Sequence, residues 1–230
     1  GILSTAATDL QVLNGLFQGA CKRKYGGVPI RVEYGNEIAI RLILGSLRSV
    51  AARLGVTMIP MFVETEMHYY RTYTKILNRT DQEENLGYIL HCKNCGHRKT
   101  AIEQQQKCDL CESKNSIAGP LWIGKIFDRE FVKSMIEESS NLKIQKSCEK
   151  TIHKCLEETE MPGFYFTLDE IAKKIKTSPP KLEKIILNLK ENGFTSSVTA
   201  FNPTGFRTNA NINEIIKIFN LSSETHTNTV

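Results

Sequence analysis

The chain has 230 residues, 40% hydrophobic and 24% charged, which is the composition of a globular protein with room for one large domain or two small ones. No apolar run is long enough to span a bilayer and no signal peptide opens the sequence, so we expect a cytoplasmic protein without a membrane partner. The 30 basic residues outnumber the 25 acidic ones, and the resulting net charge of +5 favours an anionic partner only weakly.

Residues 1–84 have the pattern of an α/β domain. A first strand is expected at "ILSTAATD", residues 2–9, followed by a loop with four glycines over residues 10–31. Apolar residues at helical spacing predict a helix over residues 36–55, which Gly55 ends. The stripe of this helix that we expect to be buried consists of Ile40, Ile43, Leu44, Leu47, Ala51 and Leu54.

Two strands follow this helix, "TMIPMFV" at residues 57–63 and "HYYRTYTKIL" at residues 68–77. The order strand, helix, strand, strand is that of the last part of a doubly wound sheet whose closing pair is antiparallel. The chain opens on Gly1, without an initiator methionine, and enters an apolar strand at once. We therefore expect a fragment that lacks whatever precedes Gly1.

Four of the seven cysteines form two Cys-x2-Cys pairs separated by twelve residues: Cys92, Cys95, Cys108 and Cys111. Two such pairs can direct four thiolates at one ion, so the spacing predicts a structural Zn²⁺ site. Strand-like segments at 87–91 and 97–103 and a return strand near Trp122 extend this to a zinc ribbon over residues 85–127. A disulfide would need an oxidising compartment, and a redox pair would be one Cys-x2-Cys at a helix start.

Two histidines lie beside the cysteines. His91 and His97 could replace a ligand, but with four thiols available we expect them at the surface. Of the remaining cysteines, Cys148 and Cys155 lie seven residues apart on a helical pattern, and we expect both to be buried apolar residues. Cys21 could be a reactive thiol, but we expect it to have a structural role.

Residues 128–230 have the pattern of an α+β winged-helix-like domain. Two helices are expected at 128–140 and 144–159, and Thr167-x-x-Glu170 is a capping box that opens a short third one. A fourth helix is expected after Thr177, with its two prolines in the first turn and Gly193 at its end. Two strands joined by "NPTG" complete a helix-turn-helix with a β-wing, and the polar tail "SSETHTNTV" is expected to be disordered.

Several residues could carry chemistry. Asp9 ends the first strand, where open α/β sheets place ligand-facing groups, but the residue alone favours a helix or turn cap. Glu37 and Arg41 are spaced for an ion pair on the long helix. Three basic groups could contact phosphates or could be solvated surface, namely Lys22, Arg23 and Lys24; Lys173, Lys174, Lys176, Lys181 and Lys184; and Arg207 in the wing.

Longer stretches carry a resemblance. "TAATDLQVLNG", "CKRKYGGVPIRVEYGNEIAIRLILGSL", "HYYRTYTKI", "GPLWIGKIFD" and "GFYFTLDEIAKKIK…NGFTSSVTAFNPTGFRT" occur in this order between about residues 4 and 219. Together they resemble the downstream half of the tRNA (guanine26-N2)-dimethyltransferases, closest in style to the archaeal members. The resemblance implies that residues 1–84 are the C-terminal part of a class I, Rossmann-like methyltransferase sheet.

The family transfers methyl groups from S-adenosylmethionine to the exocyclic amine of a guanine in tRNA, so the resemblance implies tRNA as partner, S-adenosylmethionine as cofactor and a monomer. The cofactor-binding strands and the catalytic Asp-Pro-Phe motif would lie upstream of Gly1, which would leave the fragment inactive alone. Many members read Cys-His-Glu where this chain reads Gly35-Asn36-Glu37, so only Glu37 matches. The matching positions imply a pocket at Thr8, Asp9 and Glu37 and tRNA contacts at Lys22, Arg23, Lys24, Tyr25, Arg71 and the basic residues of the C-terminal domain named above.

A second class remains open from the residues. A zinc ribbon joined to a winged helix would also suit a non-enzymatic nucleic-acid-binding protein. A glycine-rich strand-loop and an Asp-Pro-Phe motif upstream of Gly1 would favour the enzyme, whereas a start codon at that point would favour the binder.

Overall fold

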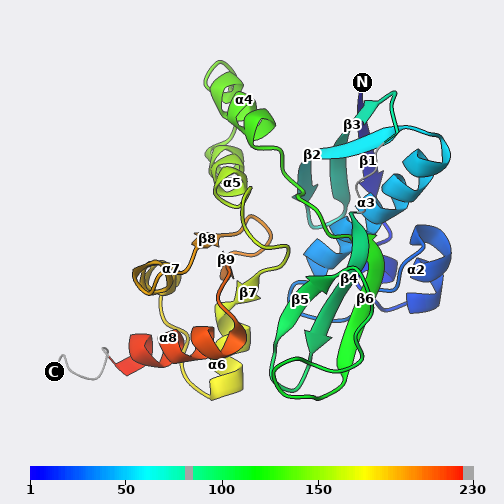
Figure 1. Cartoon of the computed structure of the whole chain (residues 1–230). Helices are drawn as coiled ribbons and strands as arrows, with labels where there is room; N and C mark the ends of the chain where they lie inside the picture. The colour runs from blue at the N-terminus through cyan, green and yellow to red at the C-terminus, as the bar shows by residue number, and fades with distance from the viewer. Residues whose placement is uncertain (81–84, 225–230) are drawn as a thin grey trace. The chain divides into compact units, whose positions relative to one another are not determined.

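The computed structural model describes residues 1–80 and 85–224 (Figure 1). The chain forms two compact units, one of Gly1–Phe131 and one that begins at Val132. The predicted segments 1–84 and 85–127 therefore lie in the same unit. The boundary expected between them falls at residues 81–84, which are outside the described residues.

The first sheet has the order β1-β3-β2, from β1 (Ile2–Ala7), β2 (Thr57–Thr65) and β3 (Tyr70–Leu77). The middle strand β3 is antiparallel to both neighbours, so β1 and β2 run parallel and α3 (Gly35–Arg53) forms the crossover between them. This confirms the predicted strand, helix and antiparallel closing pair. Among the described residues β1 pairs on one side only, and its side chains are exposed or half-buried instead of forming core.

Helix α3 is the buried centre of the first unit. Its side chains from Glu37 to Leu44 are all buried, and Gly55 ends it with φ +68°. Leu54, expected in the buried stripe, is 71% exposed because it is the C-cap residue, where the chain already leaves the helix. A side chain at Gly45 would place its Cβ 3.0 Å from the Cα of Leu121, so glycine there lets α3 lie close against β6.

The loop expected over residues 10–31 is wrong in part, because two short helices lie in it. These are α1 (Leu10–Leu13) and α2 (Gln18–Tyr25). Gly15 follows the first helix with φ +85°, and Gly26 caps the second with φ +76°. Two of the four glycines therefore mark helix ends, and the basic cluster lies on a helix.

The second sheet of this unit has the order β5-β4-β6 and is antiparallel throughout. Its strands are β4 (Leu86–Cys92), β5 (Arg98–Ala101) and β6 (Asn115–Trp122), which correspond to the three strands predicted around the cysteines. Tyr34, buried just before α3, bonds the Nδ1 of His91 through its hydroxyl at 3.2 Å and stacks under the guanidinium of Arg98. These contacts tie the cysteine-bearing sheet to the start of α3.

The second unit has a small antiparallel sheet of order β7-β9-β8, surrounded by helices. Its core contains side chains of α6, α7, α8 and β9, among them Ile171, Leu189, Phe206 and Phe219. The elements of this part of the chain are α4 (Arg129–Ser139), α5 (Lys146–Glu157), β7 (Phe166–Thr167), α6 (Leu168–Ile175), α7 (Leu182–Glu191), β8 (Ser196–Val198), β9 (Gly205–Thr208) and α8 (Ile212–Glu224).

Several predictions for this unit are confirmed and some are wrong. The Thr167 hydroxyl accepts a hydrogen bond from the backbone N–H of Glu170, as the capping box requires, and Gly193 ends α7 with φ +84°. The prolines at 179 and 180 precede α7 instead of lying in its first turn. Strand β7 and helix α8 were not predicted, and α8 extends into the tail expected to be disordered, of which residues 225–230 lie outside the described residues.

The cysteines outside the cluster are placed as follows. Cys155 is buried as expected, whereas the burial expected for Cys148 is wrong, because this side chain is exposed. Cys21 is also buried. Across residues 1–80 and 85–224, no helix combines the length and the apolar character that a membrane crossing needs.

Candidate functional site

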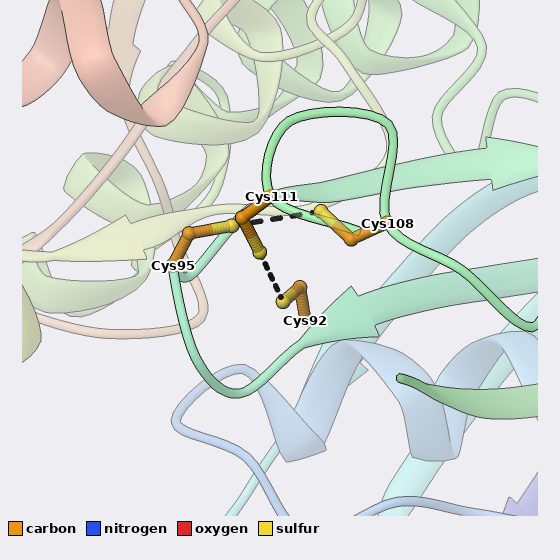
Figure 2. A group of neighbouring side chains, drawn as sticks. All are labelled: Cys92, Cys95, Cys108 and Cys111. Atoms are coloured by element: carbon orange, nitrogen blue, oxygen red, sulfur yellow. Dashed lines mark hydrogen bonds between the residues drawn. The ribbon is translucent and has the colours of Figure 1, made fainter. Parts of the chain in front are cut away.

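The four predicted ligand cysteines come together at one end of the second sheet (Figure 2). Cys92 ends β4, and Cys95 lies in the turn between β4 and β5. Cys108 and Cys111 lie in the segment between β5 and β6. Their sulfur atoms all lie within 4.8 Å of one another, with Cys92 to Cys111 at 3.4 Å and Cys95 to Cys108 at 3.6 Å. A disulfide would need about 2.05 Å, whereas four sulfurs at about 2.3 Å from a tetrahedral Zn²⁺ lie about 3.8 Å apart.

Backbone and side-chain donors surround the sulfur atoms. The N–H of His97 points at Cys95 Sγ (3.4 Å) and the N–H of Leu110 at Cys108 Sγ (3.5 Å), two residues beyond each cysteine. Hydrogen bonds from Ser113 lower the pKa of Cys111 to about 5, whereas burial raises the pKa of Cys95 to about 12. A divalent cation would remove the remaining thiol protons, so the donor set fits a closed metal site. Neither histidine belongs to the group of four.

A second candidate site lies at the end of β1. Asp9 occupies the N-cap position of α1, but its side chain makes no capping hydrogen bond. Instead the Tyr25 hydroxyl donates to Oδ1 at 2.5 Å and Lys24 Nζ donates to Oδ2 at 3.0 Å. Both donors come from the last turn of α2. The side chain of Asp9 is therefore a held acceptor and not a cap.

Electrostatics keep Asp9 ionised. Partial burial raises the pKa of its carboxyl, but the hydrogen bonds from Tyr25 and Lys24 and the Lys24 charge outweigh this, so the pKa lies below its usual value. Burial and the bond to Asp9 raise the pKa of Tyr25, which keeps its proton at neutral pH. Burial, with a contribution from the Asp9 charge, also raises the pKa of Cys21 to about 11, as expected for a structural thiol.

Asp9, Lys24 and Tyr25 line a pocket of about 440 Å³. It brings together four of the predicted site residues, Thr8, Asp9, Lys24 and Tyr25, with backbone and side chains of β1 and α3. The volume lies in the range of small-ligand sites, and a carboxylate beside a lysine gives it one acceptor and one donor of opposite charge.

Glu37, also expected in a pocket, lies instead in the interior. Its side chain is fully buried, and its Oε1 accepts from Arg41 Nε at 2.9 Å, which confirms the predicted ion pair. The same guanidinium donates through Nη1 to the carbonyls of Trp122 and Gly124. The pair therefore fastens α3 to the end of β6, and Glu37 has a structural place in this chain.

A polar network beside the pocket was not found from the sequence. The buried Tyr70 hydroxyl bonds Asn14 Oδ1 at 3.0 Å and Asn36 Oδ1 at 2.9 Å, and Tyr70 pairs in register with Ala7. It thereby joins the ends of α1, α3 and β3 around the end of β1. The residues lie up to 56 positions apart in sequence, so no local spacing indicates the contact.

Most of the predicted basic contacts are accessible. Lys22, Arg23 and Lys24 are exposed on α2, and Lys173, Lys174 and Lys181 are exposed around α6 and α7, while Lys184 is half-buried. Arg71 on β3 is half-buried, with its guanidinium 4.8 Å from the Tyr69 ring and 3.8 Å from Glu64. These positions remain predictions as nucleic-acid contacts.

Arg207 contradicts its prediction. It is 2% exposed on β9, and its Nε donates to Glu158 Oε2 at 2.5 Å. Its Nη1 donates to the Pro162 carbonyl at 2.7 Å, and its guanidinium lies 5.5 Å from the Phe201 ring. A side chain held in this way cannot contact a phosphate at the surface.

The fold and the cysteine group define a mixed α/β protein with a candidate four-thiolate metal centre and a pocket at the end of a strand. The chain matches the family model described as "N2,N2-dimethylguanosine tRNA methyltransferase" over residues 1–220, and it belongs to this family. The resemblance drawn from its motifs is thus confirmed.

Individual relatives agree. The chain is 33% identical to the tRNA (guanine(26)-N(2))-dimethyltransferase of Methanobrevibacter smithii, over 96% of this chain and 61% of the relative. It is also 33% identical to the tRNA (guanine(26)-N(2)/guanine(27)-N(2))-dimethyltransferase of Aquifex aeolicus, over 94% of this chain and 57% of the relative. The chain therefore spans about three fifths of the length of the curated relatives that it matches.

A solved structure has the same fold. Trm1 from Pyrococcus horikoshii, in complex with S-adenosyl-L-methionine, superposes with a TM-score of 0.82 at 28% identity, over 95% of this chain and 58% of that one.

Proposed function

We propose that this chain is part of a tRNA (guanine26-N2)-dimethyltransferase, which transfers methyl groups from S-adenosylmethionine to the exocyclic N2 of a guanine in tRNA. The observation that carries the proposal is the family match over residues 1–220, supported by the activity in the names of the relatives. The family does not favour the alternative of a non-enzymatic binder. The finer fold assignments that go with it are the end of a class I sheet, a zinc ribbon and a winged-helix-like unit.

The proposed role of the pocket is to orient the guanine. A base inside a stacked helix is out of reach, so the target nucleotide must leave its stack. The ionised Asp9 can then accept an N–H of the flipped base, while Tyr25 and Lys24 keep its carboxylate in place. As a methyl group joins the amine nitrogen, the nitrogen loses a proton, and an adjacent carboxylate stabilises the positive charge that develops.

S-adenosylmethionine supplies the electrophilic methyl group when it is bound. The sequence contains no G-x-G loop of the kind that lines dinucleotide and related sites. We assign most of the cofactor contacts to the part of the relatives' length that this chain does not span. Within the chain, the pocket at Asp9 fits an amine-bearing base, because its paired carboxylate offers an acceptor.

The experiment that tests the function measures methyl transfer by the protein at the relatives' full length, with labelled S-adenosylmethionine and a tRNA that carries guanine at position 26. We expect N2-methylguanine at that position. For Asp9→Asn we expect kcat/KM to fall about 10- to 150-fold, the range for losing a hydrogen bond to a charged group. Glu138→Gln on the exposed surface of α4 serves as the control and should keep full activity. Equal rates for Asp9→Asn and the unsubstituted enzyme would remove Asp9 from the site.

The four cysteines are proposed to hold one Zn²⁺ that stabilises the β4–β6 sheet. Four protein ligands close a tetrahedral shell and leave no position for water or substrate, so the ion would be structural and not catalytic.

The second unit is proposed to hold the tRNA by its backbone. A helix does not fit the narrow major groove of A-form RNA, so phosphates and shape would be recognised in place of base edges. For Lys181→Gln with Lys184→Gln we expect weaker tRNA binding and a salt dependence of log K that is less steep by about 1.4 to 1.8, the share of two phosphate contacts. The measurement is a fluorescence titration at several salt concentrations. Glu183→Gln on the same helix is the matched control and should bind equally or slightly more tightly. An unchanged slope in the double variant would make the lysines ordinary solvated surface.

A further inference from the structure

The turn between α1 and α2 combines exposed apolar side chains with concentrated positive charge. Leu16 and Phe17 are 54% and 51% exposed, next to each other in the chain. Residues 10–32, which contain them, hold four basic residues and no acidic one, although the whole chain has 25 acids. Lys24 is paired with Asp9, whereas Lys22 and Arg23 are exposed beside the apolar pair. Two neighbouring large apolar side chains in water, next to exposed positive charge, favour an interaction surface over chance exposure.

Phe17 occupies a position where helices favour a small polar residue. It is the N-cap residue of α2 and makes no side-chain capping hydrogen bond. Serine, threonine, asparagine or aspartate would stabilise the helix start by about 1 kcal/mol relative to an apolar residue. A half-exposed aromatic residue at this position departs from the local preference, and such departures are expected at functional positions.

The turn that presents Phe17 is nevertheless well defined. Gly15 takes φ +85°, a conformation that disfavours other residues, and a Cβ there would lie 3.2 Å from Arg31 Cγ. The Gln18 side chain donates to the Pro29 carbonyl at 3.0 Å, and the Leu16 N–H donates to the Gln11 carbonyl at 2.9 Å. The exposed pair is thus held by its surroundings, so little ordering entropy would be lost on binding.

The basic side chains near this turn project in several directions. Lys22, Arg23 and Lys24 are consecutive and exposed on α2, and consecutive helical residues project about 100° apart. A fan of cations of this kind suits a polyanion that curves around the helix more than a flat charged surface such as a membrane. Tyr25 lies at the other end of α2, where its hydroxyl donates to Asp9 in the pocket. At a rise of 1.5 Å per residue, Tyr25 is about 12 Å from Phe17 along the helix.

We propose that Leu16 and Phe17 form a stacking tip that covers an unpaired tRNA base near the nucleotide in the Asp9 pocket, while Lys22 and Arg23 contact the flanking phosphates. The inference rests on the proposed function and adds a specific apolar contact to it. A nucleotide that leaves its stack exposes the faces of its neighbours, and an aromatic ring can cover such a face regardless of base identity.

The test is tRNA binding by the 230-residue chain at several salt concentrations, with two variants that act through different physics. Phe17→Ala should weaken binding about 5- to 150-fold, the range for removing one aromatic stacking partner, and should leave the salt slope unchanged. Lys22→Gln with Arg23→Gln should weaken binding and reduce the slope by about 1.4 to 1.8. Leu54→Ala, an exposed leucine at the far end of α3, is the control and should bind normally.

A direct signal comes from Phe17→Trp, whose indole emission should be quenched by tRNA while the buried Trp122 of the unsubstituted chain reports no such change. Unchanged affinity for Phe17→Ala, with the unsubstituted chain still binding tRNA, overturns the stacking tip and leaves the proposed function standing. No tRNA binding by the unsubstituted chain at any salt concentration overturns the proposed tRNA role of this chain as well. The same variants are also tested on phosphatidylserine vesicles. If Phe17→Ala binds these vesicles less tightly than the unsubstituted chain but binds tRNA equally well, the tip contacts a membrane, and the inference is overturned.

Discussion

Removing the proposed zinc ion, or one of its four candidate ligands, is expected to unfold the cysteine-bearing sheet. For Cys108→Ser we expect the zinc content to fall from about one ion per chain to near zero, because three remaining thiolates do not close the tetrahedral shell. Zinc binding to small structural sites is worth on the order of 10 kcal/mol, and that free energy is available to the fold only while the ion is bound. Without the ion, sheet β5-β4-β6 should therefore unfold before the rest of the chain.

The chain carries its own reporter for this change. Trp122 lies in β6, is buried, and donates from Nε1 to the Lys125 carbonyl at 2.8 Å. Its fluorescence should shift to longer wavelength in Cys108→Ser and in the unsubstituted chain treated with a strong chelator. The measurements are metal analysis and the emission maximum.

Cys148→Ser is the matched control, because Cys148 is an exposed cysteine outside the group of four. It should keep both the metal and the emission maximum. A chelator-treated chain that keeps Trp122 buried, or purified protein with a Cys92–Cys111 disulfide in place of the ion, would contradict the zinc site.

The grouping of the four cysteines could be predicted because the information for it is local. Each Cys-x2-Cys pair forms a tight turn by itself, and the segment between the pairs is short enough for a hairpin, so the spacing indicates that the four sulfur atoms come together. The long helix α3 was equally clear from its apolar period. The helices α1 and α2 were missed because each is short and lies among four glycines, and a glycine-rich segment is typical of a loop.

The residues alone favour a cap for Asp9, which is wrong, because its side chain makes no capping hydrogen bond and accepts from Tyr25 and Lys24. An aspartate before a helix is a common cap, and the residues that decide between cap and ligand lie 15 and 16 positions further on. Helix α8, by contrast, had a signal that was overlooked. Asn211 accepts from the N–H of Glu214 while the Glu214 carboxylate accepts from the N–H of Asn211, which is a capping box three residues wide.

Arg207 was misplaced for a physical reason. All four residues of β9 are buried, because it is the central strand of β7-β9-β8 and helices cover it. A strand buried on both faces has no alternation of polar and apolar residues. The sequence therefore gives no sign that an arginine in this strand is buried, because its partner, Glu158, lies 49 residues away in the chain.

Breaking that pair gives the largest expected loss of stability in the second unit. Glu158 accepts from Arg207 Nε, from the Thr199 hydroxyl at 2.8 Å and from the Ala200 N–H at 3.0 Å, and its side chain is fully buried. Arg207→Met keeps the apolar bulk against Phe201 but leaves a buried carboxylate without its cation. Removing one partner of a buried ion pair costs about 3–5 kcal/mol, so urea unfolding of the second unit should shift by that amount. Lys190→Met, an exposed lysine on α7, should change stability by less than about 0.5 kcal/mol.

The pH dependence of Arg207→Met separates a lost charge from lost packing. Burial raises the pKa of Glu158 above the ordinary 4.5 and Arg207 lowers it, so without Arg207 the folded-state pKa must rise further. The folded variant then holds a proton that the unfolded chain has released, and its stability falls as pH rises from about 4.5 towards the raised pKa. The deficit against the unsubstituted chain should therefore be small in acid and grow towards neutral pH. Glu158→Leu combined with Arg207→Met should be more stable at neutral pH than Arg207→Met alone, because no charge is left buried. A deficit that is the same at every pH, with no gain from the second substitution, would mean that Arg207 stabilises the unit by packing alone.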